Sequence, residues 1–315
     1  MGEDFRHIVS GLRHVDEVLE GFGYKAGDRL GHALVLGTDI EKWMADNEAV
    51  PLPKQEHLEN LLWMWGTNTC CGLELPIKLE VLESRIMDLA SEIYGHSESL
   101  NVRMLYHAYQ KKFDMDHEKI IRNILGKETR DRQEHVAVNN ASEEMCYGVW
   151  TEDKLLMTNY CPVFESRHSK IELVPVKGDD VAVYKALQNY LIDKVEKRGI
   201  YIEENPTSNL TIGDFSYMKQ HPIFHLNSRK GEGHNVFVTV NSDDPAVFNT
   251  NVENELAYIY YAAEAQGEGR SEILEWVDKI RQYGMDASFI QNEKSAEQIL
   301  AEIQRILWEI GKAEF

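Results

Sequence analysis

The stretch HNVFVTVNSDDPAVF (His234–Phe248) indicates the fold class, because it joins an apolar run to a polar loop. The run VFVTV (Val236–Val240) consists of β-branched and aromatic residues, which are typical of a strand. The polar loop Ser242–Pro245 ends that strand. Three patterns of helical periodicity follow it, at Glu253–Gln266, Ser271–Tyr283 and Ser295–Lys312. A strand followed by helices is typical of an α/β fold.

Two other segments show the same rhythm. A helix is predicted over Asp4–Leu19, a strand over Arg29–Leu36 and a short helix near Asp39–Trp43. Gly199–Leu210 (GIYIEENPTSNL) predicts a strand that ends in a polar turn. The two α/β portions flank a middle that is mainly helical, so we divide the chain into residues 1–45, an insertion at 46–198, and residues 199–315.

The middle contains both helical and weaker extended patterns. The residues with helical patterns are Leu73–Gly95, Asn101–Gly126 and Val181–Gly199. Weaker extended segments are predicted at Val149–Pro162 and Lys170–Asp180, and a polar loop is predicted at Lys127–Glu144.

The composition excludes several classes of function. The 315 residues include 33 basic and 53 acidic side chains, a net charge of −20, which disfavours direct binding to nucleic acid. No apolar stretch is long enough to span a bilayer, and no signal peptide is evident. The four cysteines form no CxxC pair, which fits a reducing cytoplasm. Small-molecule chemistry or protein assembly is therefore the expectation.

Polar clusters follow the three predicted strands: Gly31-His32, Asn205–Asn209 and Ser242–Pro245. In parallel α/β folds the reactive residues lie at the carboxyl ends of the strands. A histidine at one strand end and two adjacent aspartates at another suit a metal-assisted hydrolase. Each cluster also has a plain structural interpretation. Asp-Asp-Pro is a common helix N-cap, a single histidine is often an interior residue, and Pro-Thr-Ser-Asn is a common turn.

These residues resemble the C-terminal motifs of the adenosine deaminase family. The matching segments are Arg29–Ala33, Asn205–Leu210 with His221–Ile223, Val238–Phe248 and Gln282–Phe289. Gly2–Asp4 is similar to the end of the family's fifth strand, which reads His-Ala-Gly-Glu. The resemblance implies the C-terminal part of a (β/α)₈ TIM barrel, with strands six to eight and a large helical insertion. That insertion and the start Gly2–Phe5 are similar to the divergent bacterial deaminases of RADAR-type antiviral defence.

The resemblance also implies a reaction and residue roles. A zinc-activated water attacks C6 of an adenine nucleoside or nucleotide, and ammonia leaves to give the inosine product. Asp243 corresponds to a zinc ligand, and Glu3 to the glutamate that protonates the purine ring nitrogen beside C6. His32 corresponds to the histidine that orients the attacking hydroxide, and Asp244 to the aspartate that binds the purine. Adenosine, deoxyadenosine, AMP and ATP all remain open as substrates.

The sequence departs from the family pattern at the metal. No HxH motif occurs and the fifth-strand histidine is absent, so three of four zinc ligands are missing. His7 and His14 are expected to face away from the site. Three parallel strands would also leave two open edges. We therefore expect an incomplete C-terminal fragment, or one half of a split enzyme, that needs an N-terminal half for activity.

Two alternatives remain. The chain could be a catalytically inactive remnant that acts as a binding or assembly module, including a homo-oligomer formed through the region of Trp63, Trp65 and Cys70-Cys71. It could also carry out another amidohydrolase-type reaction with the same residues.

Overall fold

A parallel sheet of three strands forms the centre of the α/β portions. The computed structural model describes residues 2–95, 97–113, 149–213, 215–229, 233–288 and 296–312. The strands β1 (Arg29–Gly31), β4 (Tyr201–Glu204) and β5 (Phe237–Val240) lie in the order β1-β4-β5. Ile202 of the central strand pairs with Leu30 on one side and Val238 on the other. All three side chains are buried.

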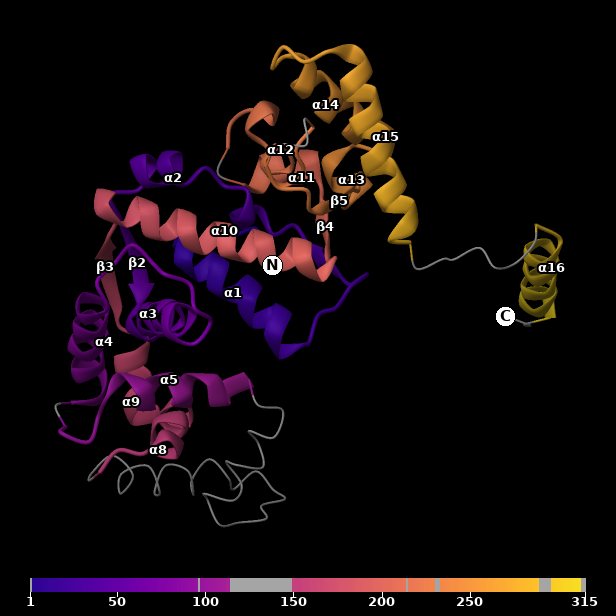
Figure 1. The fold of residues 1–315 in the computed structure, drawn as a ribbon. Helices are drawn as coiled ribbons and strands as arrows, with labels where there is room; N and C mark the ends of the chain where they lie inside the picture. Colours follow the sequence, from indigo (N-terminus) through magenta and orange to yellow (C-terminus); the bar gives the residue numbers. More distant parts are fainter. Residues whose placement is uncertain are drawn as a thin grey trace.

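Long helices cover this sheet. They are α1 (Ile8–Gly21), α10 (Val181–Arg198), α14 (Val252–Glu264) and α15 (Arg270–Asp286). Helix α10 runs alongside α1, whereas α14 and α15 lie beyond β5 (Figure 1). Leu12, Val15 and Leu19 are fully buried, which confirms the predicted apolar face of the first helix. Gly199 caps the C-terminus of α10 with a φ of 66°, which suits a glycine, as the sequence predicts.

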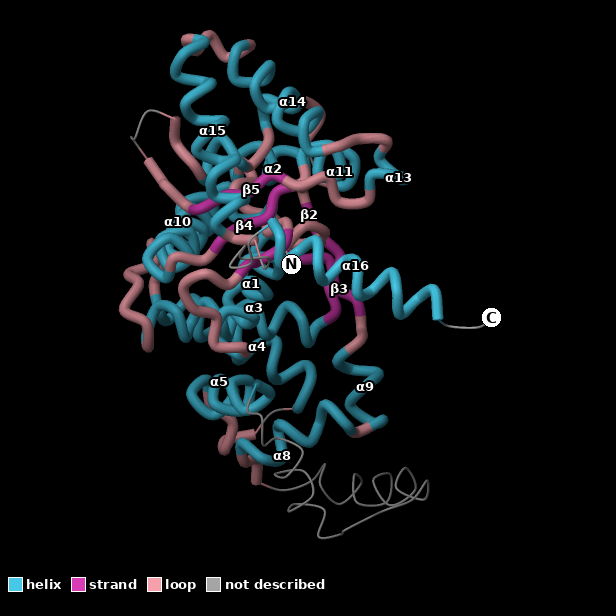
Figure 2. Tube along the Cα trace, turned by 90° about the vertical axis from the view of Figure 1, so that its right-hand side faces the viewer, coloured by secondary structure: helices cyan, strands magenta, loops and turns pink. Residues whose placement is uncertain are grey.

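The middle of the chain forms a separate group of helices with a small sheet. Its helices are α3 (Lys54–Thr69), α4 (Leu79–Tyr94), α5 (Val102–Gln110), α8 (Glu152–Met157) and α9 (Pro162–His168). Strands β2 (Ala49–Pro53) and β3 (Ile171–Pro175) pair antiparallel. Figure 2 shows α5 and α8 at one end of the molecule and α14 and α15 at the other.

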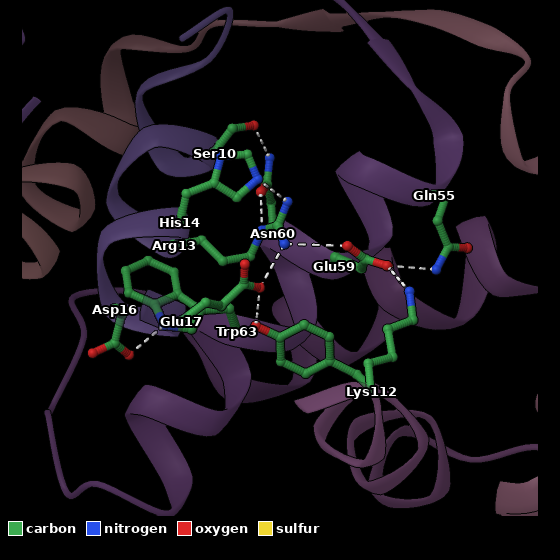
Figure 3. A network of polar contacts seen from close by, with 11 residues as sticks. Ser10, Arg13, His14, Asp16, Glu17, Gln55, Glu59, Asn60, Trp63 and Lys112 are labelled. Carbon is green, nitrogen blue, oxygen red and sulfur yellow. Dashed lines mark hydrogen bonds and ion pairs between the residues drawn. The ribbon is translucent and has the colours of Figure 1, made fainter. Parts of the chain in front are cut away.

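A buried polar network joins this helical group to α1 (Figure 3). Arg13 of α1 donates from Nε to Asn60 Oδ1 of α3 at 2.9 Å, and its Nη1 lies 3.1 Å from Glu59 Oε2. Trp63 of α3 donates from Nε1 to Asp16 Oδ2 of α1 at 2.8 Å. These contacts fix the helical middle to the α/β portion, because buried polar groups need their partners.

The shorter elements complete the fold. The short α-helices are α2 (Ile40–Asp46), α11 (Pro206–Ile212), α12 (Ile223–Leu226) and α13 (Pro245–Phe248), and the last long helix is α16 (Ala296–Lys312). The 3₁₀ turns are η1 (Leu34–Leu36), η2 (Lys111–Phe113), η3 (Thr158–Tyr160), η4 (Gly178–Asp180) and η5 (Met218–Gln220). Within the described ranges, no helix is long and apolar enough to cross a membrane.

Three sequence predictions need correction. The first helix begins at Ile8 rather than Asp4, because His7 is its N-cap. The first strand ends at Gly31 rather than Leu36, because His32 and Ala33 turn the chain with positive φ angles. Val149–Pro162 was expected to be extended but contains α8, whose N-cap Thr151 accepts a hydrogen bond from the Lys154 N–H.

Other predictions are confirmed or fall outside the described residues. Lys170–Asp180 does contain a strand, β3. In Asn101–Gly126 the helix α5 ends at Gln110, and the part of that range after residue 113 lies outside the described residues. The predicted loop Lys127–Glu144 lies there too. The domain boundaries stay a prediction.

Candidate active site

Two of the predicted site residues meet at the carboxyl end of the sheet. Glu3 precedes α1, and His32 directly follows β1. Glu3 Oε1 lies 2.8 Å from His32 Nδ1, and the two side chains are 19% and 23% exposed. A carboxyl and an imidazole at this distance are within hydrogen-bond reach of each other, which is the geometry that general acid–base chemistry uses.

The backbone after β1 explains how His32 reaches Glu3. His32 has a φ of 65° and Ala33 a φ of 48°. The His32 N–H still donates to the Glu203 carbonyl of β4 at 2.8 Å. The hydrogen-bond ladder between β1 and β4 therefore ends where the turn begins. The Val35 N–H then donates to the Gly2 carbonyl at 2.9 Å and holds the two segments together. Left-handed non-glycine residues are uncommon and often occur at functional sites.

The loop after β4 contributes a third polar group. Asn209 of α11 is fully buried, and its Nδ2 lies 3.1 Å from Glu3 Oε1 and 3.0 Å from His32 Nδ1. Asn205 also places its Nδ2 near His32 Nδ1, at 3.3 Å. The structure therefore brings together residues from three segments that are far apart in the sequence.

The two aspartates after β5 behave differently from each other. Asp243 has a φ of 55°, and its Oδ2 accepts a hydrogen bond from Ser208 Oγ at 2.7 Å. Asp244 Oδ1 accepts from the N–H groups of Ala246 and Val247, so Asp244 caps α13. Both aspartates are exposed. The capping role is the plain interpretation that the Asp-Asp-Pro sequence allows.

Sequence reasoning missed a buried polar layer beneath these residues. Glu204, at the end of β4, and His221, just before α12, are both buried, and His221 Nε2 lies 3.7 Å from Glu204 Oε2. The signal was present in the strand, because Ile200, Ile202 and Glu204 alternate on its buried face. Burial, reinforced by the charge of Glu3, raises the pKa of Glu204 well above its ordinary range. Burial also lowers the pKa of His221 to about 3.

A second missed residue anchors the loop that carries Asn209. Glu255 of α14 is fully buried and accepts hydrogen bonds from the Thr207 N–H at 2.8 Å and from Thr207 Oγ1 at 2.6 Å. Thr250 Oγ1 donates to the same carboxylate. This carboxylate holds the first turn of α11 in place.

A cavity of about 760 Å³ opens beside Glu3. Its walls include Phe5, Trp43, Phe215 and His225. The volume is within the range of small-molecule sites. Of the four predicted site residues, Glu3 lines this cavity, whereas His32, Asp243 and Asp244 do not. Glu3 therefore connects the cavity to the polar groups at the strand ends.

The residues present do not fit a zinc ion. Among the side chains that the structure describes, no group of three or more histidine, cysteine, aspartate or glutamate residues could hold a metal. Catalytic zinc sites use three protein ligands. His7 and His14 do not supply them: His7 packs edge-on against Trp43 and Tyr184, and His14 Nε2 lies 3.0 Å from Arg13 Nη2.

Comparison with known protein families gives a match over the C-terminal part of the chain. Residues 179–306 match the adenosine deaminase family. That part of the chain is similar to the adenosine deaminases. The deaminase segment includes β4, β5, Asn209 and both aspartates, whereas Glu3 and His32 lie outside it.

Individual deaminases show the same partial coverage. The chain is 31% identical to the adenosine deaminase of Plasmodium vivax (strain Salvador I) over 99 residues, which are 31% of this chain and 26% of that protein. It is 32% identical to the adenosine deaminase of Plasmodium falciparum (isolate 3D7), with the same coverage. It is 34% identical to the adenine deaminase of Rhizobium etli over 103 residues, 33% of this chain and 28% of that one. The chain thus spans between a quarter and a third of these relatives.

Proposed function

We propose that the chain takes part in the hydrolytic deamination of an adenine nucleoside or nucleotide. The observation that carries this proposal is the Glu3–His32 pair at 2.8 Å, set against Asn209 of the deaminase segment. A carboxyl within hydrogen-bond reach of a histidine beside a cavity is suited to general acid–base chemistry. Adenosine, deoxyadenosine, AMP and ATP are the substrates to test.

Each residue has a proposed task in this reaction. Glu3 gives its proton to the purine ring nitrogen beside C6, which makes C6 electrophilic. Water then adds to C6 with its oxygen while His32 orients it, and the Glu3–His32 pair takes up one proton of that water. The pair passes this proton to the amino group, the C6–N bond breaks and ammonia leaves. The C6 hydroxyl returns its proton to Glu3, and the inosine product remains. Asp244 binds the imidazole side of the purine after release from its capping contact.

The proposed architecture is the C-terminal part of a (β/α)₈ barrel. The order β1-β4-β5 is the order expected of strands six, seven and eight. Residues 46–198 are the proposed insertion between the first two of these strands, and such an insertion supports the likeness to RADAR-type antiviral deaminases.

Zinc, with Asp243 as one ligand, needs histidines from outside the described residues, which a longer polypeptide or an N-terminal half would supply. The exposed Cys70 and Cys71 are free thiols, which supports a reducing cytoplasm.

The alternative is a catalytically inactive module for binding or assembly. It is favoured by one observation, the lack of a three-ligand metal group among the described residues. A homo-oligomer is the form of assembly that light scattering would detect.

The deciding experiment measures ammonia release and zinc content for the chain alone and with a deaminase N-terminal half that carries HxH. We expect no turnover from the chain alone and turnover from the mixture. Glu3→Gln should abolish that turnover, because the amide cannot donate an acidic proton. Glu253→Gln, at an exposed position of α14 away from the cavity, is the matched control and should leave turnover unchanged.

Two results would contradict the proposal. Turnover by the chain alone with about one bound zinc would show that other side chains complete the site. Folded halves that associate, bind zinc and release no ammonia from any of the four substrates would favour the inactive module.

A further inference from the structure

The small sheet of β2 and β3 turns one apolar face to solvent. Val50, Leu52 and Val174 point to the other face and are buried. Ile171 and Leu173 of β3 are 53% and 72% exposed. Because side chains alternate along a strand, the solvent-facing side consists of Ala49, Pro51, Pro53, Ile171, Leu173 and Pro175.

The register of this sheet decides which backbone groups point outward. The Lys54 N–H donates to the Lys170 carbonyl, and the Val176 N–H donates to the Glu48 carbonyl, both at 3.0 Å. Bonded and unbonded positions alternate in an antiparallel pair, so the even-numbered residues of both strands bond to each other. The odd-numbered residues therefore direct their N–H and C=O groups away from the partner strand.

Proline makes the two outer edges of the sheet different. On β2, Pro51 and Pro53 occupy outward positions and have no N–H, so that edge is blunted. On β3, Ile171 and Leu173 each offer an N–H and a C=O, and Pro175 offers a C=O alone. In the part of the chain that the structure describes, no backbone group bonds to these atoms. Strand β3 is thus the edge to which another strand can be added.

We propose that two copies of this chain pair through β3, antiparallel, with Leu173 of each copy at the twofold axis. The Leu173 N–H of each copy then donates to the Leu173 carbonyl of the other, and the Ile171 N–H donates to the Pro175 carbonyl. Leu173 lies beside Leu173, and Ile171 beside Pro175, which removes apolar surface from water. A twofold pair uses the same edge on both copies and is closed. This inference does not depend on the proposed deamination.

Charge at the two ends of β3 supports a second copy in the antiparallel orientation. The exposed charged side chains are Glu165, Arg167 and Lys170 before the strand, and Glu48, Lys177 and Asp179 near its end. Cations are in excess at the first end and carboxylates at the second. Antiparallel pairing brings opposite excesses together, whereas parallel pairing would bring like excesses together.

Glu172 supports the proposed register. The next register on one side pairs Ile171 with Leu173 and sets Glu172 of one copy opposite Glu172 of the other, which is destabilising. The next register on the other side pairs Leu173 with Pro175 and leaves the Ile171 N–H beyond the end of the strand. With Leu173 on the axis, each Glu172 instead faces Val174 of the other copy.

The test combines light scattering of the full chain over a range of concentrations with hydrogen exchange measured at single residues. We expect a dimer to form as the concentration rises. The outward amides of Ile171 and Leu173 should exchange at least about tenfold more slowly in the dimer than in the dilute monomer. The amides of Glu172 and Val174 bond to β2 in both forms and should change little.

Three lysine substitutions at exposed positions identify the surface. Leu173→Lys places like charges at the axis and should return the chain to a monomer. Ala49→Lys adds the same charge to the same apolar face, but on β2, so the dimer should persist. Leu274→Lys, at a position of α15 that is 50% exposed, is the matched control and should leave the dimer unchanged.

Four results would overturn the inference. One is a monomer at every concentration with fast exchange at Ile171 and Leu173, and another is a dimer that survives Leu173→Lys. Loss of the dimer with Ala49→Lys would show that the sheet faces stack instead of pairing at their edges. Protection of Ile171 and Leu173 only after addition of a deaminase N-terminal half would assign the edge to a different protein.

Discussion

At the residue scale, the carboxylate of Glu255 holds the loop that carries the candidate site. Glu255→Ala leaves Thr207 and Thr250 without their acceptor in a buried place. We expect a loss of about 3 kcal/mol in the free energy of unfolding. Chemical denaturation measures it, with Glu253→Ala, an exposed position on the same helix, as the control. Equal effects of the two variants would contradict the assigned anchor role.

Buried histidines predict how stability depends on pH. Burial, and secondarily the nearby His57, lowers the pKa of His7 from 6.5 to about 3. The unfolded chain therefore binds the proton first, so stability present above pH 6.5 is lost as the pH falls toward 3. Between about pH 7.5 and about pH 5 this histidine alone should cost about 2 kcal/mol. His7→Asn keeps a capping side chain, and denaturation at both pH values should show that this part of the pH dependence is gone.

At the element scale, Arg13 joins α1 to α3. Its side chain is 4% exposed, and its guanidinium contacts Glu17, Glu59 and Asn60. Arg13→Ala leaves buried carboxylates without their cation, which should cost about 3 kcal/mol. Denaturant unfolding followed by tryptophan fluorescence will report this loss, because Trp63 lies in the same network. Arg103→Ala on the exposed face of α5 is the control, and a similar loss there would refute the special role of Arg13.

At the scale of the whole molecule, the sheet order predicts a gradient of amide protection. Strand β4 is paired on both sides, whereas β1 and β5 are the outer strands of the described sheet. Hydrogen exchange should therefore be slowest in β4. A deaminase N-terminal half that completes the proposed barrel should slow exchange in β1 and β5. Addition of that half without any change in the outer strands would contradict the proposed barrel completion.

The sequence by itself determined the α/β class, the parallel strand segments and the likeness to the adenosine deaminases. The strand run Val236–Val240 and the glycine stop of α10 are local patterns, which need only short-range sterics and alternation to be recognised. The resemblance to the adenosine deaminases needed four motifs in the same order, at Arg29–Ala33, Asn205–Leu210, Val238–Phe248 and Gln282–Phe289. The same local rules misplaced the end of β1, because the left-handed turn at His32 is stabilised by contacts with Gly2 and Glu203.

Only the tertiary structure decided which polar groups meet. Glu3 and Asn209 are 206 positions apart, yet their side chains lie within hydrogen-bond distance. Position 244 holds the expected aspartate, but its carboxylate caps α13. The sequence alone left open whether this aspartate caps a helix or binds a purine. Such contacts arise from the packing of distant segments, and no local pattern encodes them.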